Sequence, residues 1–472
     1  MTEQTRPAPA DAADIAPPSG LRGSVGVAGI VFLVVAAAAP LTAIGGALPV
    51  MFAIGNGPGV PAAYLVVAVV LLLFSIGYAA MSRHVVDTGA FYAYVTSGLG
   101  RITGSGAASL ALLTYTAIQA GIYGLAGATL SSLVTGYGGP DVSWWLWSGL
   151  LLLLVALLGY RNIDVGTKVL AVLLVLEVGI VAVVVVAILA QGGADGIDVT
   201  SFTPSAFTSG SPGIGVMFAV ASFVGFEATA IYGEEARDPK RSVPRATYLA
   251  VTLIGVFYAL ASWAFVLAVG SDKVQEAAGK DPAGLVFAVA DQYVGGAASD
   301  LMQILLVTSL FAALLAFHNA IARYLLSLGR QNSAPAVLGR VHERHGSPHV
   351  GSLAQSASAV VLVAAFAVAG ADPVLELFTW MSGLATLGVL VLMILVGVAV
   401  AAYFARTGVD RRLWHTRVAP VLGTVGLLAV LWLVLDNFTT LIGGSAWLAH
   451  AFEALVVLAF AAGAVSAVRR RA

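Results

Sequence analysis

The chain has no cysteine and few charged residues. Because none of its 472 residues is Cys, disulfides, thiolate metal sites, cysteine nucleophiles and thiol redox chemistry are excluded. Charged residues make up only 10 % of the sequence, and the net charge is -1. With so little charge, most of the chain must lie in an apolar environment.

Long hydrophobic runs make up most of the sequence. Hydrophobic residues account for 59 % of the chain and the mean hydropathy is +0.94. At about 20 residues per spanning helix, the sequence has room for about a dozen membrane spans. It predicts an all-α polytopic membrane protein. The expected spans are 24–54, 60–82, 101–134, 143–160, 165–190, 212–236, 245–269, 298–328, 350–370, 374–404, 418–436 and 446–467.

The distribution of Lys and Arg predicts the topology. Twelve spans place both termini on one side, and 21 of the 23 basic residues then fall on that side, with only Lys273 and Lys280 opposite. The positive-inside rule therefore predicts cytoplasmic termini, in the cytoplasmic membrane. Residues 1–22 are polar and rich in Ala and Pro, so we expect a disordered cytoplasmic tail without a cleavable signal peptide.

Two of the spans contain helix breakers at mid-membrane. The first span holds Pro40, Gly45, Gly46 and Pro49, and the sixth holds Gly225 next to a carboxylate. Broken helices at positions 1 and 6 predict two five-helix repeats of opposite orientation with a site between the breaks. We therefore expect a ten-helix transport core over residues 23–405, and two further helices over 406–472.

Three segments carry a resemblance to the amino acid/polyamine/organocation (APC) superfamily of transporters, of the amino acid permease type. They are Phe223-x-Gly225-Phe226-Glu227 with Gly233-Glu234-Glu235-x-x-Asp238-Pro239-x-Arg241-x-Val243-Pro244-Arg245, then Asn319-Ala320-x-Ala322-Arg323-Tyr324-Leu325 with Leu328-Gly329-Arg330 and Pro335, and Gly89 to Val95. The resemblance implies the leucine-transporter fold, alternating access, and amino acids or amines carried by proton symport or exchange.

The two breaks supply the candidate substrate site. A half-helix beginning near Gly45 would offer N–H groups to a carboxylate, and carbonyls near Phe223 would face an ammonium. The alternative is that the breakers only kink the helices for packing. Phe223 is a candidate gate, and Tyr115 with Gln119 a polar strip, unless these side chains only pack against neighbours. The full candidate set is Pro40, Leu41, Thr42, Ala43, Gly45, Gly46, Tyr115, Gln119, Phe223, Val224, Gly225 and Phe226.

Three buried ionisable residues are candidates for proton coupling. Glu227 lies ten residues before Arg237, and Glu177 lies nine residues after Lys168, so both are about 13–15 Å from the inner boundary. Related transporters often have a lysine near the position of Glu177, so this chain departs from lysine-based coupling. His318 is the third candidate. Each of the three has the alternative of a structural hydrogen bond.

Metal and cofactor sites are not expected. His342, His345 and His349 lie close together in a predicted cytoplasmic loop, but no cysteine or carboxylate pair accompanies them. The charged run 238–245 is expected to anchor the inner end of span 6 and to form inner-gate ion pairs with Arg83 and Asp87.

The sequence therefore predicts a secondary active transporter of an amino acid or a related small amine, proton-coupled or exchanging. A sodium-coupled amine or polyamine carrier, or a non-transporting sensor on the same fold, remains the alternative. No enzymatic residue set is present, so we expect no enzyme. The expected partners are a small-molecule substrate, protons and the lipid bilayer, with no nucleic acid and with the oligomeric state open.

Overall fold

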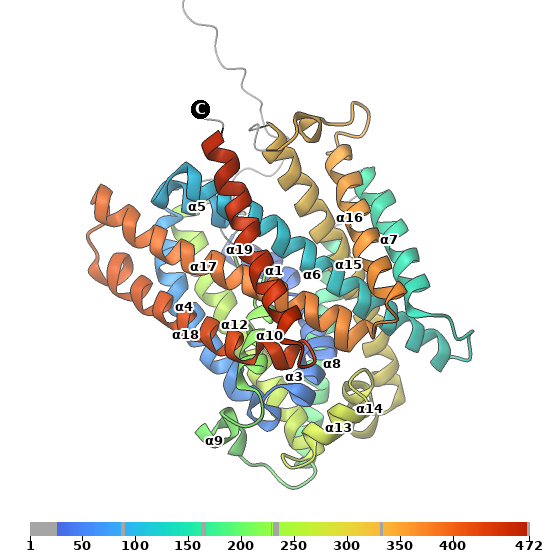
Figure 1. Cartoon of the computed structure of the whole chain (residues 1–472). Helices are drawn as coiled ribbons and strands as arrows, with labels where there is room; N and C mark the ends of the chain where they lie inside the picture. Colours follow the sequence, from blue (N-terminus) through green and yellow to red (C-terminus); the bar gives the residue numbers. More distant parts are fainter. Residues whose placement is uncertain are drawn as a thin grey trace, which may run out of the picture.

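The computed structural model describes residues 26–85, 90–161, 167–227, 229, 236–330 and 334–469. Within these ranges the protein is helical and forms no β-sheet (Figure 1). Ten helices are long and apolar enough to cross a membrane, and two shorter apolar helices accompany them, Trp144–Tyr160 and Pro212–Ser222. The prediction of an all-α membrane protein is confirmed. The predicted tail over 1–22 lies outside the described residues.

The helices follow the predicted spans closely. Their bounds are α1 Val27–Ala37, α2 Pro40–Thr42, η1 Ala43–Ala47, α3 Leu48–Ile54, η2 Gly57–Gly59, α4 Val60–Met81, α5 Ala90–Leu99, α6 Arg101–Gly136, α7 Trp144–Tyr160, α8 Thr167–Gln191, η3 Thr200–Phe202, α9 Pro204–Phe207, α10 Pro212–Ser222, α12 Pro239–Val269, α13 Val274–Lys280, α14 Leu285–Tyr293, α15 Gly296–Arg330, η5 Ala336–Gly339, α16 His349–Val368, η6 Pro373–Phe378, α17 Thr379–Thr407, η7 Trp414–Val418, α18 Ala419–Leu441 and α19 Ala446–Arg469.

The first span is broken at Ala38 and Ala39. Helix α1 ends at Ala37, and Ala39 has φ +46°, a left-handed conformation that is uncommon for a residue with a side chain. The helix restarts at Pro40 and continues through α2, the π-helical turn η1 and α3 to Ile54. The restart comes earlier than Gly45, where we expected it. Pro40 explains the difference, since proline suits the first helical position and disfavours a helical residue before it.

The sixth span is broken directly after α10. This helix ends at Ser222, and residues 223–227 form turns in which Gly225 has φ +113°. Only glycine adopts this backbone conformation without strain. The predicted span ran to residue 236, and most of its second half, including Gly233, Glu234 and Glu235, lies outside the described residues. The next helix, α12, begins at Pro239.

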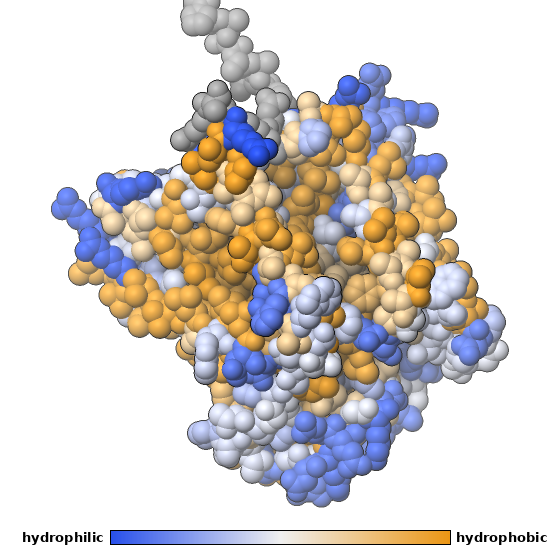
Figure 2. Space-filling model, in the orientation of Figure 1, coloured by the Kyte–Doolittle hydropathy of each residue, from blue (hydrophilic) through white to orange (hydrophobic). Residues whose placement is uncertain are grey.

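Helix α6 lies in the centre of the molecule and packs against α5, α7, α15, α17 and α19, while α4 packs against α12 and α18. The loop after α15 and the end of α19 lie at the top of Figure 1, and α9, α13 and α14 lie at the opposite end. Hydrophobic surface covers the middle of the molecule, with hydrophilic residues towards both ends (Figure 2). This distribution suits a protein surrounded by lipid.

Candidate functional site

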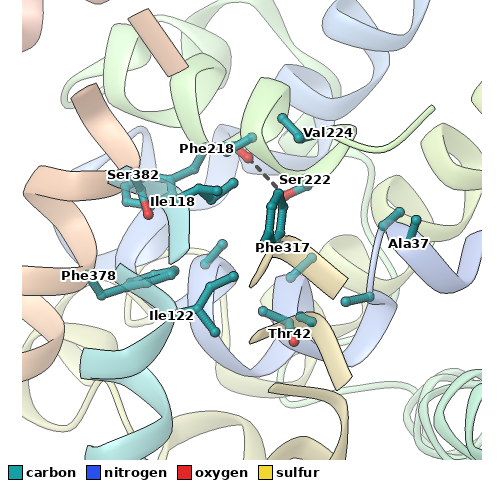
Figure 3. Close-up of a pocket in the computed structure, with 16 residues that line it drawn as sticks. Ala37, Thr42, Ile118, Ile122, Phe218, Ser222, Val224, Phe317, Phe378 and Ser382 are labelled. Atoms are coloured by element: carbon teal, nitrogen blue, oxygen red, sulfur yellow. Dashed lines mark hydrogen bonds between the residues drawn. The ribbon is translucent and has the colours of Figure 1, made fainter. Parts of the chain in front are cut away.

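A cavity of about 60 Å³ lies where the two helix breaks meet. Figure 3 shows Ala37, Thr42, Ser222 and Val224 from the breaks around it, with Phe317 projecting from α15. The lining residues come from the first span, α6, α10, α15 and the start of the tenth span. They are Ala37, Ala38, Ala39, Thr42, Ala43, Ala47, Ile118, Ile122, Phe218, Ala221, Ser222, Val224, Ala313, Phe317, Phe378 and Ser382.

Among the described residues, the cavity lining contains no charged side chain. Only Thr42, Ser222 and Ser382 carry side-chain oxygens, and the other lining residues are alanine, branched aliphatic or phenylalanine. The fixed partial charges therefore come from the backbone. Helices α1 and α10 end at the cavity with the negative ends of their dipoles, and the helix from Pro40 begins there with its positive end.

Glu177 on α8 caps the beginning of the helix that starts at Pro40. Its carboxylate accepts the backbone N–H of Leu41, while the N–H of Ala43 bonds to the carbonyl of Ala39. Pro40 has no N–H. Among the described residues, the N–H of Thr42 is therefore the remaining donor of this first turn, and Thr42 lines the cavity.

A chain of hydroxyl groups connects Glu177 to the cavity. The hydroxyl of Ser309 on α15 donates to Oε2 of Glu177 at 3.0 Å, and it lies 3.4 Å from the hydroxyl of Thr42. Glu177 is only 4 % exposed. A change in the charge of this carboxylate would therefore alter the hydrogen bonds at both the helix start and the cavity wall.

Glu227 holds the second break together. Its Oε2 accepts the backbone N–H of Gly225 at 2.8 Å, and the hydroxyl of Tyr115 is a further hydrogen-bond partner of the carboxylate. The backbone carbonyl of Glu227 accepts from the hydroxyl of Tyr78 at 2.8 Å. The carboxylate is bonded to the broken backbone and does not line the cavity, which matches the structural alternative for this residue.

The structure brings only part of the predicted set to the cavity. Thr42, Ala43 and Val224 line it, whereas Gly45 and Gly46 face Leu306 and Leu125. A Cβ on either glycine would come within 2.9 Å of these leucines, so the two glycines permit close helix packing. Pro40 and Leu41 form the helix start beside the cavity without lining it.

The aromatic residues of the second break pack away from the cavity. The ring of Phe223 packs edge-on against Tyr258 at 6.3 Å, and Phe226 packs against Phe74 at 6.1 Å. Both phenylalanines are buried, and neither lines the cavity. Among the described residues, Phe218, Phe317 and Phe378 are the aromatic side chains at the cavity instead.

Tyr115 and Gln119 are both engaged by neighbouring helices. Tyr115 contacts Glu227, as described, and its ring lies 6.1 Å from that of Phe317. The amide of Gln119 donates to the carbonyl of Leu314 at 3.1 Å and accepts from Gln355. Tyr115 thus reaches the cavity through Phe317, while Gln119 links α6 to α15 and α16.

His318 also binds a neighbouring helix. Its Nε2 lies 2.8 Å from the hydroxyl of Ser352 on α16, and a Cβ at Gly159 on α7 would lie 2.3 Å from its ring. His318 is buried and does not line the cavity. Its contacts match the structural alternative of a satisfied hydrogen-bond partner.

Several cavity residues were not predicted from the sequence, of which Ile118 and Ile122 on α6 are the most readily predictable. They are one helical turn apart, on the face next to Tyr115 and Gln119. Their spacing identifies this apolar face, but the prediction was based on the polar residues Tyr115 and Gln119 beside it. Phe218, Phe317, Phe378 and Ser382 carry no such signal, because they come from four separate helical elements.

The predicted histidine loop forms an aromatic cluster. His342 and His345 have ring centroids 4.7 Å apart, and Tyr160 packs against both. The Nδ1 of His342 accepts the backbone N–H of Arg344 at 3.2 Å, which occupies a potential ligand atom. Within the described ranges, no group of three or more His, Asp or Glu side chains is arranged to hold a metal ion.

The predicted inner-gate ion pairs are not seen among the described residues. Arg241 lies 3.8 Å from Asp238 of its own helix end, and both side chains are exposed. Asp87 lies outside the described residues, so its predicted pairing is not tested.

Apolar spans around a cavity, with the ends of broken helices converging on it, define a multi-span membrane protein. The chain belongs to the amino acid permease family of the APC superfamily, whose residue pattern matches residues 25–461. The resemblance seen in the sequence is thereby confirmed, and the family and its named relatives are transporters.

Individual relatives are distant. The chain is 25 % identical to the branched-chain amino acid permease of Lactococcus lactis over 80 % of this chain and 82 % of that protein. It is 25 % identical to the gamma-aminobutyric acid permease of Escherichia coli over 65 % and 66 % of the two chains. An amino-acid permease of Candida albicans is 29 % identical over 39 % of this chain, and the match spans 30 % of that relative's length.

Proposed function

We propose that the protein transports a compact neutral amino acid, or a related small amine, across the cytoplasmic membrane by alternating access. The observation that carries the proposal is the cavity at the meeting point of two helix breaks. Family membership and the names of the relatives support an amino acid as the substrate.

The proposed architecture is the leucine-transporter fold with twelve spans. Ten of them would form the 5+5 inverted repeat over residues 23–405, and two would follow over 406–472, with both termini in the cytoplasm. The breaks in the first and sixth spans and the distribution of basic residues support this arrangement.

The cavity favours a ligand with few atoms and an uncharged side chain. One water needs roughly 10–15 Å³ by the same measure of volume, so about 60 Å³ accommodates on the order of four to six water-sized groups. The substrate carboxylate would bind the N–H and hydroxyl of Thr42, and the ammonium would face the carbonyl ends of α1 and α10. The side chain would contact Ile118, Ile122 and Phe317.

Among the three coupling candidates, Glu177 has the contacts best suited to carry a proton. Its carboxylate competes with the substrate carboxylate for the positive helix end at Pro40, and Ser309 links it to Thr42. A neutral Glu177 would leave that helix end free to attract the substrate anion. Glu227 and His318 have contacts that stabilise the helix packing.

A thermal-shift screen of amino acids and amines on the purified protein, followed by uptake into proteoliposomes, tests the proposal. We expect stabilisation by neutral amino acids, and uptake that responds to a proton gradient or to internal exchange substrate. Stabilisation only by cationic amines, or uptake driven by a sodium gradient alone, would favour the alternative carrier. Binding without uptake would favour a sensor.

A further inference from the structure

A second, larger cavity is lined by residues other than those of the helix breaks. It has a volume of about 330 Å³ and lies between the end of α4, the first turn of α12 and the segment that joins α17 to η7. Its lining residues are Arg83, His84, Lys240, Val409, Asp410 and Arg412. Every lining side chain except Val409 is ionisable.

The charges of this cavity do not balance. Among the described residues that line it, Arg83, Lys240 and Arg412 are cations, and Asp410 is the single carboxylate. Arg412 binds Asp410 in a bidentate pair through one edge of its guanidinium, at 2.6 Å from Nη2 to Oδ2 and 3.0 Å from Nε to Oδ1. The hydrogen bond from Arg412 lowers the pKa of Asp410 to about 2, so the carboxylate is ionised at neutral pH. Its negative charge is neutralised by Arg412.

Arg83 and Lys240 are then left in excess. Within the described residues, no ion pair is recorded for either, and the buried Nε of Arg83 has no hydrogen-bond partner. The ring of His84 packs against that of Phe404, with the centroids 5.7 Å apart. His415 and Tyr248 lie close enough to Arg83 and Arg412 to interact electrostatically with both. Two cations that line one concave site without an ion pair among the described residues favour the binding of an anion.

The surface beside the cavity is apolar and exposed. Leu413 and Trp414, directly after Arg412, are 62 % and 48 % exposed, and Leu249 and Leu253 are exposed on α12. In Figure 2 hydrophilic residues gather at the ends where α17 and α18 are joined, and hydrophobic surface borders them along these helices. Tryptophan is enriched at the membrane–water boundary, where lipid headgroups lie.

We propose that this cavity binds the phosphate of an anionic phospholipid, whose acyl chains lie along the exposed apolar faces of α12 and α18. Arg83 and Lys240 contact the phosphate, and Arg412 closes the site from the α17–η7 segment. Basic pockets between membrane helices are suited to such headgroups. The apolar border favours a lipid over a free phosphate, because acyl chains can pack against the exposed apolar residues beside the cavity and a free phosphate cannot.

Native mass spectrometry of the delipidated full chain, titrated with phosphatidylglycerol or phosphatidylcholine, tests this site. We expect wild type to bind one phosphatidylglycerol in preference to phosphatidylcholine. The R83Q/K240Q variant should lose that preference by about fivefold per cation removed, or roughly 25-fold in total. K240Q alone, at an exposed side chain, should lose about fivefold and covers the case in which R83Q fails to fold.

The matched control removes the same charge at the opposite end of the molecule. Lys273 and Lys280 lie beside and within α13, where Lys280 pairs with Glu276 at 2.5 Å. K273Q/K280Q should bind phosphatidylglycerol as wild type does. Equal losses in both double variants, or no lipid preference in wild type, would overturn the proposal. Full displacement of the bound lipid by inorganic phosphate would assign the site to a soluble anion instead.

Discussion

Glu177 and Glu227 have similar depth in the membrane by sequence spacing but different partners in the structure. Glu227 bonds the backbone of the break through Gly225 and is fixed by Tyr115. Glu177 bonds the helix start at Leu41 and reaches Thr42 through Ser309. At the residue scale these contacts separate a carboxylate that supports the fold from one that connects to the cavity.

The first prediction concerns E177Q. Glutamine retains an oxygen that accepts a hydrogen bond from Leu41 or Ser309 but cannot carry the charge, so uptake should continue and become independent of pH. The measurement is initial uptake into proteoliposomes from mildly acidic to neutral pH. E227Q is the matched control and should keep the pH dependence of wild type. Loss of pH dependence in E227Q with retention in E177Q would reverse the assignment.

The second prediction concerns the stability of E227A. Removing the carboxylate leaves the half-buried N–H of Gly225 and the hydroxyl of Tyr115 without this acceptor, which should cost about 1–3 kcal/mol of folding free energy. E227Q keeps one acceptor oxygen and should lose less. Thermal denaturation of the purified variants measures the difference. Equal stability of E227A and wild type would show that the carboxylate does not hold the break.

At the residue level, the sequence singled out residues whose chemistry is unusual for their surroundings and gave no signal for ordinary ones. A carboxylate in an apolar run identifies itself, so Glu177 and Glu227 were found. Phe317 and Ser382 are common residues in common patterns, and only the three-dimensional arrangement brings them to the cavity. The ring of Phe223, the predicted gate, packs against Tyr258 on α12 and not against the cavity.

At the scale of the element, the two breaks lie against each other. A Cβ placed on Gly225 would come within 3.2 Å of the backbone carbonyl carbon and the Cβ of Ala37 at the end of α1. Gly225 therefore meets two requirements, a positive φ and a close approach between the broken spans.

The third prediction separates these requirements. G225A and G100A both place a side chain at positive φ, with φ +113° and +93°, but no atom lies within 4 Å of a Cβ on Gly100. Both variants should lose about 1–3 kcal/mol of stability from strain. Only G225A should also lose uptake, by roughly tenfold or more, which corresponds to about 1.4 kcal/mol. Equal uptake in the two variants would argue that the contact between the breaks is unimportant.

Sequence predicted that both spans break but not where each helix restarts. Proline and glycine density marks the first break and predicts a restart near Gly45, whereas the helix restarts at Pro40. Gly45 and Gly46 lie within the restarted segment and pack against Leu306 of α15 and Leu125 of α6. Such contacts between distant segments cannot be read from local sequence.

At the scale of the whole molecule, the apolar runs predicted the long helices with small boundary differences, but not the short helices α5, α13 and α14 or the end of α10 at Ser222. Hydropathy succeeds here because every backbone polar group in a membrane must be satisfied within the helix. The same principle leaves few sequence signals for how the helices pack, so the small cavity and the basic cavity beside Arg83 both required the structure.

Counterflow of a labelled neutral amino acid into proteoliposomes tests most directly whether the cavity between the breaks is the transport site. Wild type should accumulate label transiently when unlabelled substrate is inside. The variant A313W places an indole in the cavity wall and should abolish counterflow while retaining a folded, monodisperse protein. Counterflow that persists in A313W, or label that binds wild type without crossing the membrane, would contradict the account.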